Sequence, residues 1–212
     1  MPLPAPRSSS WKNLFIGGAY DAPDDQHANS GNDIVGNASN AMMQACSSGS
    51  GDSKIYFFRA RMGDANPSTT LYLGFDLNRD GRADLFVEAN VTAAAGANPF
   101  VAFHKSDPTK DGSSPATTGW LNSCYDPKIQ IKISSDDSYI AKTSAGTNVD
   151  GGSGASGTDS WIEFGFRLAD LKLFAKSALG FDTVSDDSLV SLFLFTSTGQ
   201  TANGDIGGTD DK

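Results

Sequence analysis

Residue types that dominate many metal and catalytic sites are scarce in this chain of 212 residues. It has two each of histidine, cysteine and glutamate: His27, His104, Cys46, Cys124, Glu88 and Glu163. No HExxH or CxxC spacing occurs, which argues against the common zinc sites. The GxSxG signature of a hydrolase nucleophile is also absent. No apolar run approaches the roughly 18 residues of a membrane span, so we expect no membrane-spanning segment.

Positive charge is also in short supply. The chain has 16 basic and 25 acidic residues, a net charge of −9, which argues against binding to nucleic acid or to anionic membranes. Because only two acidic residues are Glu, the other 23 are Asp, a residue of turns, caps and hard-cation sites. Together with 23 Gly, this composition predicts strands joined by loops.

Hydrophobic periodicity predicts an all-β protein. Period-two alternation, typical of half-buried strands, is clearest in residues 54–62 and 128–134. The other predicted strands are 11–20, 70–75, 85–89, 99–104, 138–143, 160–168 and 188–196, the last a candidate central strand because both of its faces are apolar. One helix is predicted over 169–179 and ends at Gly180. We expect a jelly-roll-like β-sandwich of about nine strands with one short helix.

The domain organisation is predicted to be simple. Residues 1–11 form an extended Pro/Ser-rich arm, 12–208 a single β-sandwich domain and 209–212 an acidic tail. The first ten residues contain no apolar h-region, so we expect either a cytosolic protein or one whose secretory leader has been removed. An extended arm can add a strand to the open sheet edge of a neighbour. The expected partner is therefore a second copy of the chain.

The most informative stretch spans residues 76–84, DLNRDGRAD. It matches the first nine positions of an EF-hand loop, with side-chain oxygens at positions 1, 3, 5 and 9, Gly at position 6 and a backbone carbonyl at position 7. Three Asp residues drawn to one centre repel each other without a divalent cation, and hard oxygen ligands favour Ca²⁺. The predicted metal ligands are Asp76, Asn78, Asp80, Arg82 (through its backbone) and Asp84.

The loop departs from an EF-hand at position 12, where Val87 replaces the bidentate Glu. No helices are predicted beside it. It therefore resembles the shortened calcium loops of dockerins, thrombospondin-type repeats and extracellular β proteins, in which calcium stabilises the fold. The alternative is an acidic β-turn without metal. Residues Asp21, Asp24, Asp25 and Asp33 offer a second calcium site, with solvated turns as the simpler interpretation.

Cysteine and aromatic residues leave further alternatives open. Cys46 and Cys124 are either bridged, closing a loop worth about 4 kcal/mol, or free thiols. Trp11, Trp120 and Trp161 either pack in the sandwich or form a platform for polysaccharide. The latter would make the chain a carbohydrate-binding module.

Catalysis has little support, and the chain is predicted not to be an enzyme. Glu88 and Glu163 both fall on predicted strands and could in principle form a glycosidase pair, that of a calcium-dependent glycoside hydrolase. The simpler interpretation is that both carboxylates lie on a solvent face of a sheet.

Four segments together resemble a recurrent, uncharacterised bacterial exported or surface β-sandwich family. The segments are DIVGNASN (33–40), YFFRAR (56–61), GFDLNRDGRADLFVE (74–88) and FTSTGQTANGDIGG (195–208). The likeness covers most of residues 30–208 and is least in 105–159. It implies secretion or surface display in a bacterium and a calcium-stabilised sandwich. We therefore expect an extracellular calcium-binding protein of structural or adhesive role, as a subunit of a surface filament or matrix assembly.

Overall fold

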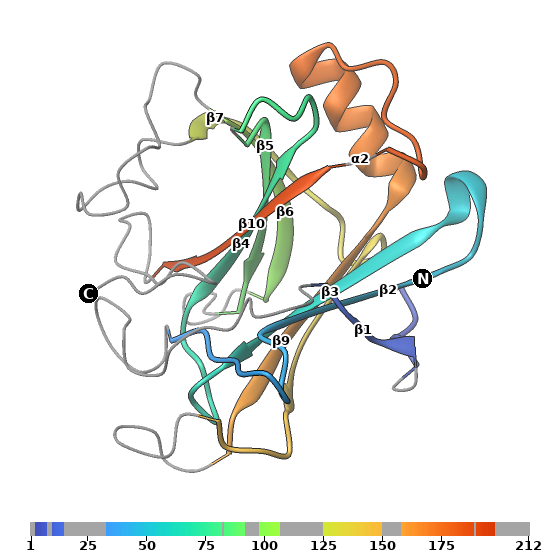
Figure 1. Ribbon diagram of the computed structural model, residues 1–212. Coiled ribbons are helices and arrows are strands. Elements are labelled where there is room, and N and C mark those ends of the chain that lie inside the picture. Colours follow the sequence, from blue (N-terminus) through green and yellow to red (C-terminus); the bar gives the residue numbers. More distant parts are fainter. Residues whose placement is uncertain are drawn as a thin grey trace.

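Two antiparallel five-stranded sheets pack against each other in the computed structural model (Figure 1). The structure describes residues 3–7, 10–14, 33–81, 83–91, 98–106, 125–149, 158–188 and 190–197. Nine of the strands have six residues or more, and β1 has two. The expected all-β sandwich with about nine strands and one short helix is confirmed.

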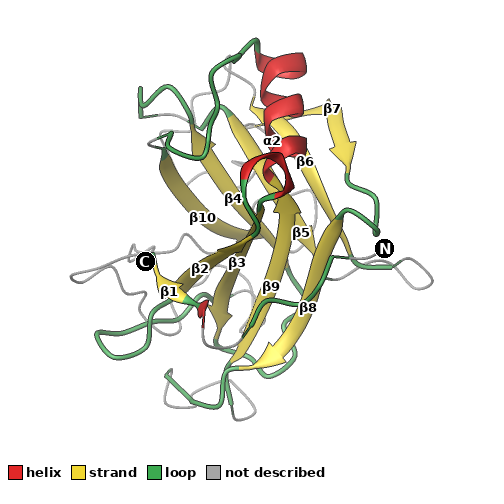
Figure 2. Ribbon diagram, turned by 90° about the vertical axis from the view of Figure 1, so that its right-hand side faces the viewer, coloured by secondary structure: helices red, strands yellow, loops and turns green. Residues whose placement is uncertain are grey.

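The first sheet has the order β1-β2-β3-β9-β8. Figure 2 shows β1 beside β2 at one edge of this sheet and β8 at the other. Its strands are β1 (Lys12–Asn13), β2 (Met43–Ser48), β3 (Ile55–Met62), β9 (Ser160–Arg167) and β8 (Ser138–Ser144).

The second sheet has the order β10-β4-β5-β6-β7. Four of its strands follow one another along the chain as a meander, and β10 pairs antiparallel with β4. The strands are β10 (Ser191–Ser197), β4 (Thr70–Asp76), β5 (Leu85–Asn90), β6 (Phe100–Ser106) and β7 (Tyr125–Lys132).

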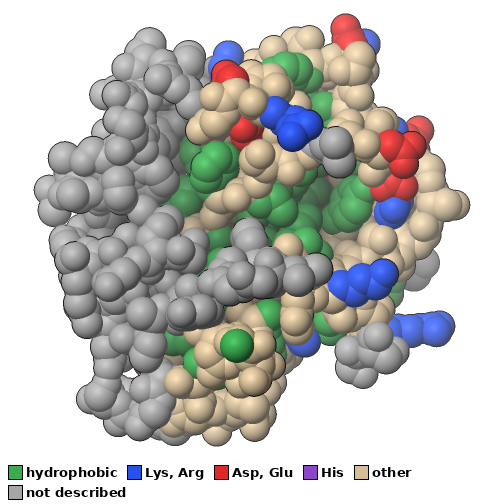
Figure 3. Space-filling model, viewed as in Figure 1, with side chains coloured by type: hydrophobic (Ala, Val, Ile, Leu, Met, Phe, Trp, Pro, Cys, Tyr) green, Lys and Arg blue, Asp and Glu red, His purple; other side chains and the backbone are tan. Residues whose placement is uncertain are grey.

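An aromatic cluster joins the inner faces of the two sheets. The ring centroid of Phe58 in β3 lies 5.7 Å from that of Phe164 in β9 of the same sheet. It lies 6.0 Å from the ring centroid of Phe75 in the opposite sheet. Phe103 of β6 contacts Phe166 across the sandwich at 5.2 Å. Hydrophobic side chains are visible between the two sheets in Figure 3, with charged ones toward the periphery. Burial of these rings supplies the main apolar contribution to folding.

The predicted helix is confirmed and closes one end of the sandwich (Figure 1). It consists of α2 (Leu168–Phe174) followed by a wider turn, η4 (Ala175–Leu179). Gly180 ends it in the left-handed region, with φ 77°, as the C′ position predicts. Phe174 enters the core 5.4 Å from Phe103. A short 3₁₀ turn, η3 (Gly51–Ser53), joins β2 to β3.

Two strand assignments from the sequence need correction. The candidate central strand 188–196 is β10, which lies at the edge of its sheet, and its Phe193 is 36% exposed. Of the predicted strand 11–20, only Lys12 and Asn13 form β1, while residues 15–20 lie outside the described part. Strand β2 was not predicted, because MQACSS has no clear alternation of apolar and polar residues.

The N-terminal arm packs on its own sheet. Leu3 is 6% exposed and packs with Ile55 and Phe57 on the outer face of the first sheet. Ser10 closes a turn by donating its backbone N–H to the carbonyl of Arg7, at 3.1 Å. The arm continues into β1, which pairs with β2.

Gly165 of β9 allows the ring of Phe57 on the neighbouring strand to pack closely. An added Cβ would lie 2.5 Å from Phe57 Cδ1 and 3.0 Å from the Tyr56 carbonyl oxygen, and the backbone atom cannot move aside cheaply. We predict that Gly165→Ala lowers the free energy of unfolding by about 1–3 kcal/mol, measured by urea denaturation. Ser47→Ala, at an exposed position of β2, is the control and should stay within about 0.5 kcal/mol. Equal effects of the two substitutions would contradict the packing argument.

Candidate calcium loop and the polar outer faces

The predicted calcium loop connects β4 to β5 and is built around Asp76, the last residue of β4. Its carboxylate belongs to a side chain only 1% exposed. Oδ1 accepts hydrogen bonds from the backbone N–H groups of Arg79 and Asp80, and Oδ2 accepts one from Gly81 at 2.9 Å. Arg79 and Gly81 have φ of 64° and 90°, the left-handed conformation that such a tight turn requires. Asp76 thus holds the turn in place.

Asp84 closes the other side of the loop. Its backbone N–H donates to the Phe75 carbonyl at 2.8 Å, and its Oδ2 accepts from the Leu77 N–H at 2.7 Å and the Asn78 N–H at 3.3 Å. Burial raises the pKa of Asp84; the two backbone donors oppose this shift, and the charges of Asp80 and Asp76 add to it. A nearby cation would relieve this unfavourable charge.

The side chain of Asn78 brings the remaining predicted ligands together. Its Nδ2 donates to Asp80 Oδ2 at 3.2 Å and to Asp84 Oδ1 at 3.3 Å. Its Oδ1 accepts the Asp80 backbone N–H at 2.8 Å. Two carboxylates therefore converge on one amide, whose partly positive N–H₂ group lies between them.

The donor chemistry of the loop fits a hard cation. Asp76, Asn78, Asp80 and Asp84 offer only oxygen as ligand atoms, the set that calcium prefers. The backbone of Arg82 lies outside the described residues. Val87, at position 12, is fully buried in the core and supplies no ligand. Within the described residues, no group of three or more His, Cys, Asp or Glu side chains is close enough to hold a metal ion.

The second predicted calcium site is only partly described. Asp21, Asp24 and Asp25 lie outside the described residues. Asp33 is 1% exposed, and its carbonyl accepts the Gly63 N–H at 2.9 Å. Cys46 carries a free thiol, while Cys124 lies outside the described residues. Burial raises the pKa of the Cys46 thiol, and a hydrogen bond with Ser10 opposes the shift.

Glu163 lies on the outer face of the first sheet among polar and aromatic side chains. It accepts hydrogen bonds from Arg59 Nη1 at 3.2 Å, Tyr139 Oη at 3.1 Å and Thr143 Oγ1 at 2.9 Å. Burial raises the pKa of Tyr139 to about 12, with a further contribution from the charge of Glu163. Burial lowers the pKa of Arg59, and Glu163 opposes that shift. The carboxylate is thus engaged in holding three strands together.

The tryptophans of this face stack against arginines. The Arg59 guanidinium carbon lies 4.4 Å from the ring centroid of Trp11 and 4.3 Å from that of Trp161. Arg61 lies 4.3 Å from the same Trp161 ring, which is only 4% exposed. These cation–π contacts use ring surface that a sugar platform would need. Trp120, the other predicted platform residue, lies outside the described part.

Glu88 occupies the outer face of the second sheet. Its Oε2 lies 2.6 Å from His104 Nε2, and its Oε1 accepts from Asn90 Nδ2 at 3.1 Å. A glycosidase pair needs carboxyl groups within roughly 5–9.5 Å. Because Glu88 and Glu163 point outward from opposite sheets, which stack about 10 Å apart, they cannot flank one glycosidic bond. The two carboxylates do not form the glycosidase pair considered from the sequence.

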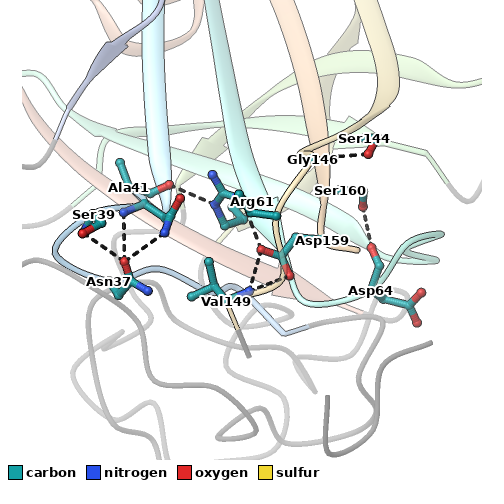
Figure 4. A network of polar contacts seen from close by, with 12 residues as sticks. Asn37, Ser39, Ala41, Arg61, Asp64, Ser144, Gly146, Val149, Asp159 and Ser160 are labelled. Atoms are coloured by element: carbon teal, nitrogen blue, oxygen red, sulfur yellow. Dashed lines mark hydrogen bonds and ion pairs between the residues drawn. The ribbon is translucent and has the colours of Figure 1, made fainter. Parts of the chain in front are cut away.

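A buried ion pair that the sequence did not predict joins Arg61 of β3 to Asp159, which lies just before β9 (Figure 4). Arg61 Nη1 lies 3.1 Å from Asp159 Oδ2, and their side chains are 5% and 0% exposed. Asp159 also accepts the Val149 N–H at 3.1 Å, and Arg61 Nη1 donates to Thr147 Oγ1 at 2.5 Å. The partners are 98 positions apart, so the only sequence signal was an arginine alternating with apolar residues in β3.

Comparison of the chain with protein-family models, curated proteins and solved structures finds no match. The family resemblance drawn from the sequence therefore stays a prediction. No helix in the described part of the chain is both long and apolar enough to span a bilayer.

Neutralising Asp159 should leave Arg61 as an unpaired buried charge. We predict that Asp159→Asn lowers the free energy of unfolding by about 3–5 kcal/mol, measured by chemical denaturation. The matched control is Asp52→Asn, which removes an ion pair with Lys172 where Asp52 is 81% exposed, and should cost less than about 1 kcal/mol. A small effect at both positions would show that the buried pair contributes little.

Proposed function

We propose that this chain is an extracellular calcium-binding protein of structural or adhesive role, displayed on a bacterial surface or in its matrix. The observation that carries the proposal is the convergence of the Asp80 and Asp84 carboxylates on the side chain of Asn78, at 3.2 and 3.3 Å. A calcium ion would supply one thing here, positive charge for clustered carboxylates. Asp76, Asn78, Asp80, Asp84 and the carbonyl of Arg82 would hold it.

The position of the loop gives binding a consequence for the fold. Asp76 ends β4 and Leu85 begins β5, so a ligand held by the loop joins two neighbouring strands. A ligand that binds only the folded state stabilises it by mass action. The loop lacks a flanking helix pair, so the proposed role is stabilisation and not sensing.

The ligand set favours an extracellular setting. With Val87 buried at position 12, the loop supplies no bidentate carboxylate at that position, and fewer charged ligands mean weaker binding. Extracellular modules use sites of about 10⁻⁴–10⁻³ M. A weak site of this kind would be filled only where calcium is abundant, outside the cell.

Calcium should stabilise the protein through this loop. At a calcium concentration about ten times the dissociation constant, mass action adds roughly 1.4 kcal/mol, which raises the melting temperature by about 3–6 °C for a chain of this size. Asp80→Ala should abolish that rise, because it removes a carboxylate facing the proposed ion. Thermal melts in EGTA and in calcium measure both effects.

The matched control is Asp182→Ala, which removes an exposed carboxylate paired with Lys176 on the surface. It should keep the full calcium-dependent rise. Magnesium at the same concentration should give a smaller rise, because it demands octahedral geometry and dehydrates reluctantly. An equal rise in the parent protein and in Asp80→Ala, or no rise in either, would contradict the proposal.

A further inference from the structure

The described residues of the N-terminal arm, 3–7 and 10–14 with β1 included, contact the sandwich at separate points. Leu3 packs on Ile55 and Phe57, and Trp11 stacks on Arg59 at 4.4 Å. Each contact is made with the outer face of the first sheet. The arm is thus arranged like a short peptide bound to a surface, with Leu3 and Trp11 as its two apolar anchors.

Backbone and polar contacts complete this attachment. Lys12 and Asn13 pair with Ala45 and Gln44 of β2, and Gln44 Nε2 donates to Asn13 Oδ1 at 2.8 Å. The N–H of Leu14 donates to the Met43 carbonyl at 3.2 Å. Sheet pairing of this kind adds a strand to an open edge, and it does not require that the strand come from the same chain.

The chain between the arm and Asp33 is long enough for the arm to make the same contacts with another copy of the protein. Eighteen residues, 15–32, separate the arm from Asp33. A stretch of that length reaches at most about 60 Å, more than the diameter of a small domain. When an identical element is exchanged between copies, every contact it makes is retained and only the connection changes.

We propose that the arm, through its described residues 3–7 and 10–14, docks on the outer face of the first sheet of a second copy of this chain. The occupant is the same sequence, so Leu3, Trp11 and β1 of one copy meet Ile55, Phe57, Arg59 and β2 of the next. Reciprocal exchange closes a dimer, and one-directional exchange builds a chain of subunits. This deepens the structural role proposed above and does not depend on the calcium loop.

The protein concentration decides whether the arm binds its own sheet or the sheet of a second copy. A tethered arm competes for its own sheet at an effective concentration in the millimolar range. Exchange between copies therefore becomes prevalent as the local protein concentration approaches that range. A crowded surface layer or matrix provides such conditions, whereas a dilute solution favours the arm on its own sheet.

Ser10 lies near the Cys46 thiol, and this proximity provides a covalent probe in the full chain. Ser10→Cys, in a Cys124→Ala background, places a thiol of the arm beside Cys46. Oxidation then records which copy each arm occupies. Equal amounts of ¹⁵N-labelled and unlabelled protein are mixed, incubated at 0.05 to about 1 mM (the tethered-arm range) and oxidised in EGTA.

We expect covalent dimers and larger products whose share rises at least fivefold across this range, with the position 10–46 linkage found between labelled and unlabelled chains by mass spectrometry. Adding Cys46→Ala should abolish them. Ser53→Cys in the same background, at an exposed site in η3, measures random collision and should give few dimers. Linkage within single chains at every concentration would overturn the proposal.

Sedimentation velocity of the unsubstituted chain covers the case in which Ser10→Cys disturbs folding. It should show a monomer with a growing fraction of dimer over the same concentrations, reduced by Trp11→Ala. A single monomer up to the highest concentration would overturn the proposal. Because both measurements succeed or fail without calcium, their outcome is separate from that of the melting experiments.

Discussion

A carboxylate that is almost inaccessible to solvent organises the β4–β5 connection. Asp76 accepts three backbone hydrogen bonds from residues 79–81 and so dictates a turn with two residues in the left-handed region. This turn places the side chain of Asn78 within hydrogen-bonding distance of both Asp80 and Asp84. The consequence is a concentration of negative charge at the end of a buried hairpin. Without a cation, repulsion between these carboxylates destabilises the folded loop. With a cation bound, the same negative charge would attract the ion and stabilise the loop.

The two outer faces of the sandwich show how charge is accommodated elsewhere. On the first sheet, Arg59 and Arg61 stack on Trp161 and pair with Glu163 and Asp159. On the second sheet, Glu88 is bonded to His104 and Asn90. In these places every acidic group has a positively charged or hydrogen-bonding partner from the chain itself. In the candidate calcium loop, the Asp80 and Asp84 carboxylates both accept hydrogen bonds from the side-chain amide of Asn78.

Features that are set by residues close together in the sequence could be predicted, whereas features that are set by the pairing of distant strands could not. The loop lies within nine consecutive residues, so its spacing alone suggested the ligand set, and Gly180 marked the end of the helix in the same way. The register of strands is not local. The pairing of Arg61 with Asp159, 98 positions away, and the opposite placement of Glu88 and Glu163 follow from which strands become neighbours. Strand β10 was misjudged because Phe195, on its outer side, is buried although the strand lies at a sheet edge.

The central claim is that the carboxylates of residues 76–84 bind one calcium ion. The most direct measurement is a titration of the ¹⁵N-labelled protein with calcium, followed through its amide resonances. Gly81 is the best reporter, since its N–H donates to Asp76 at 2.9 Å. The account predicts that the largest shifts fall within residues 76–84 and saturate at one ion per chain. Unchanged resonances in this loop at millimolar calcium, or saturating shifts confined to another part of the chain, would contradict it.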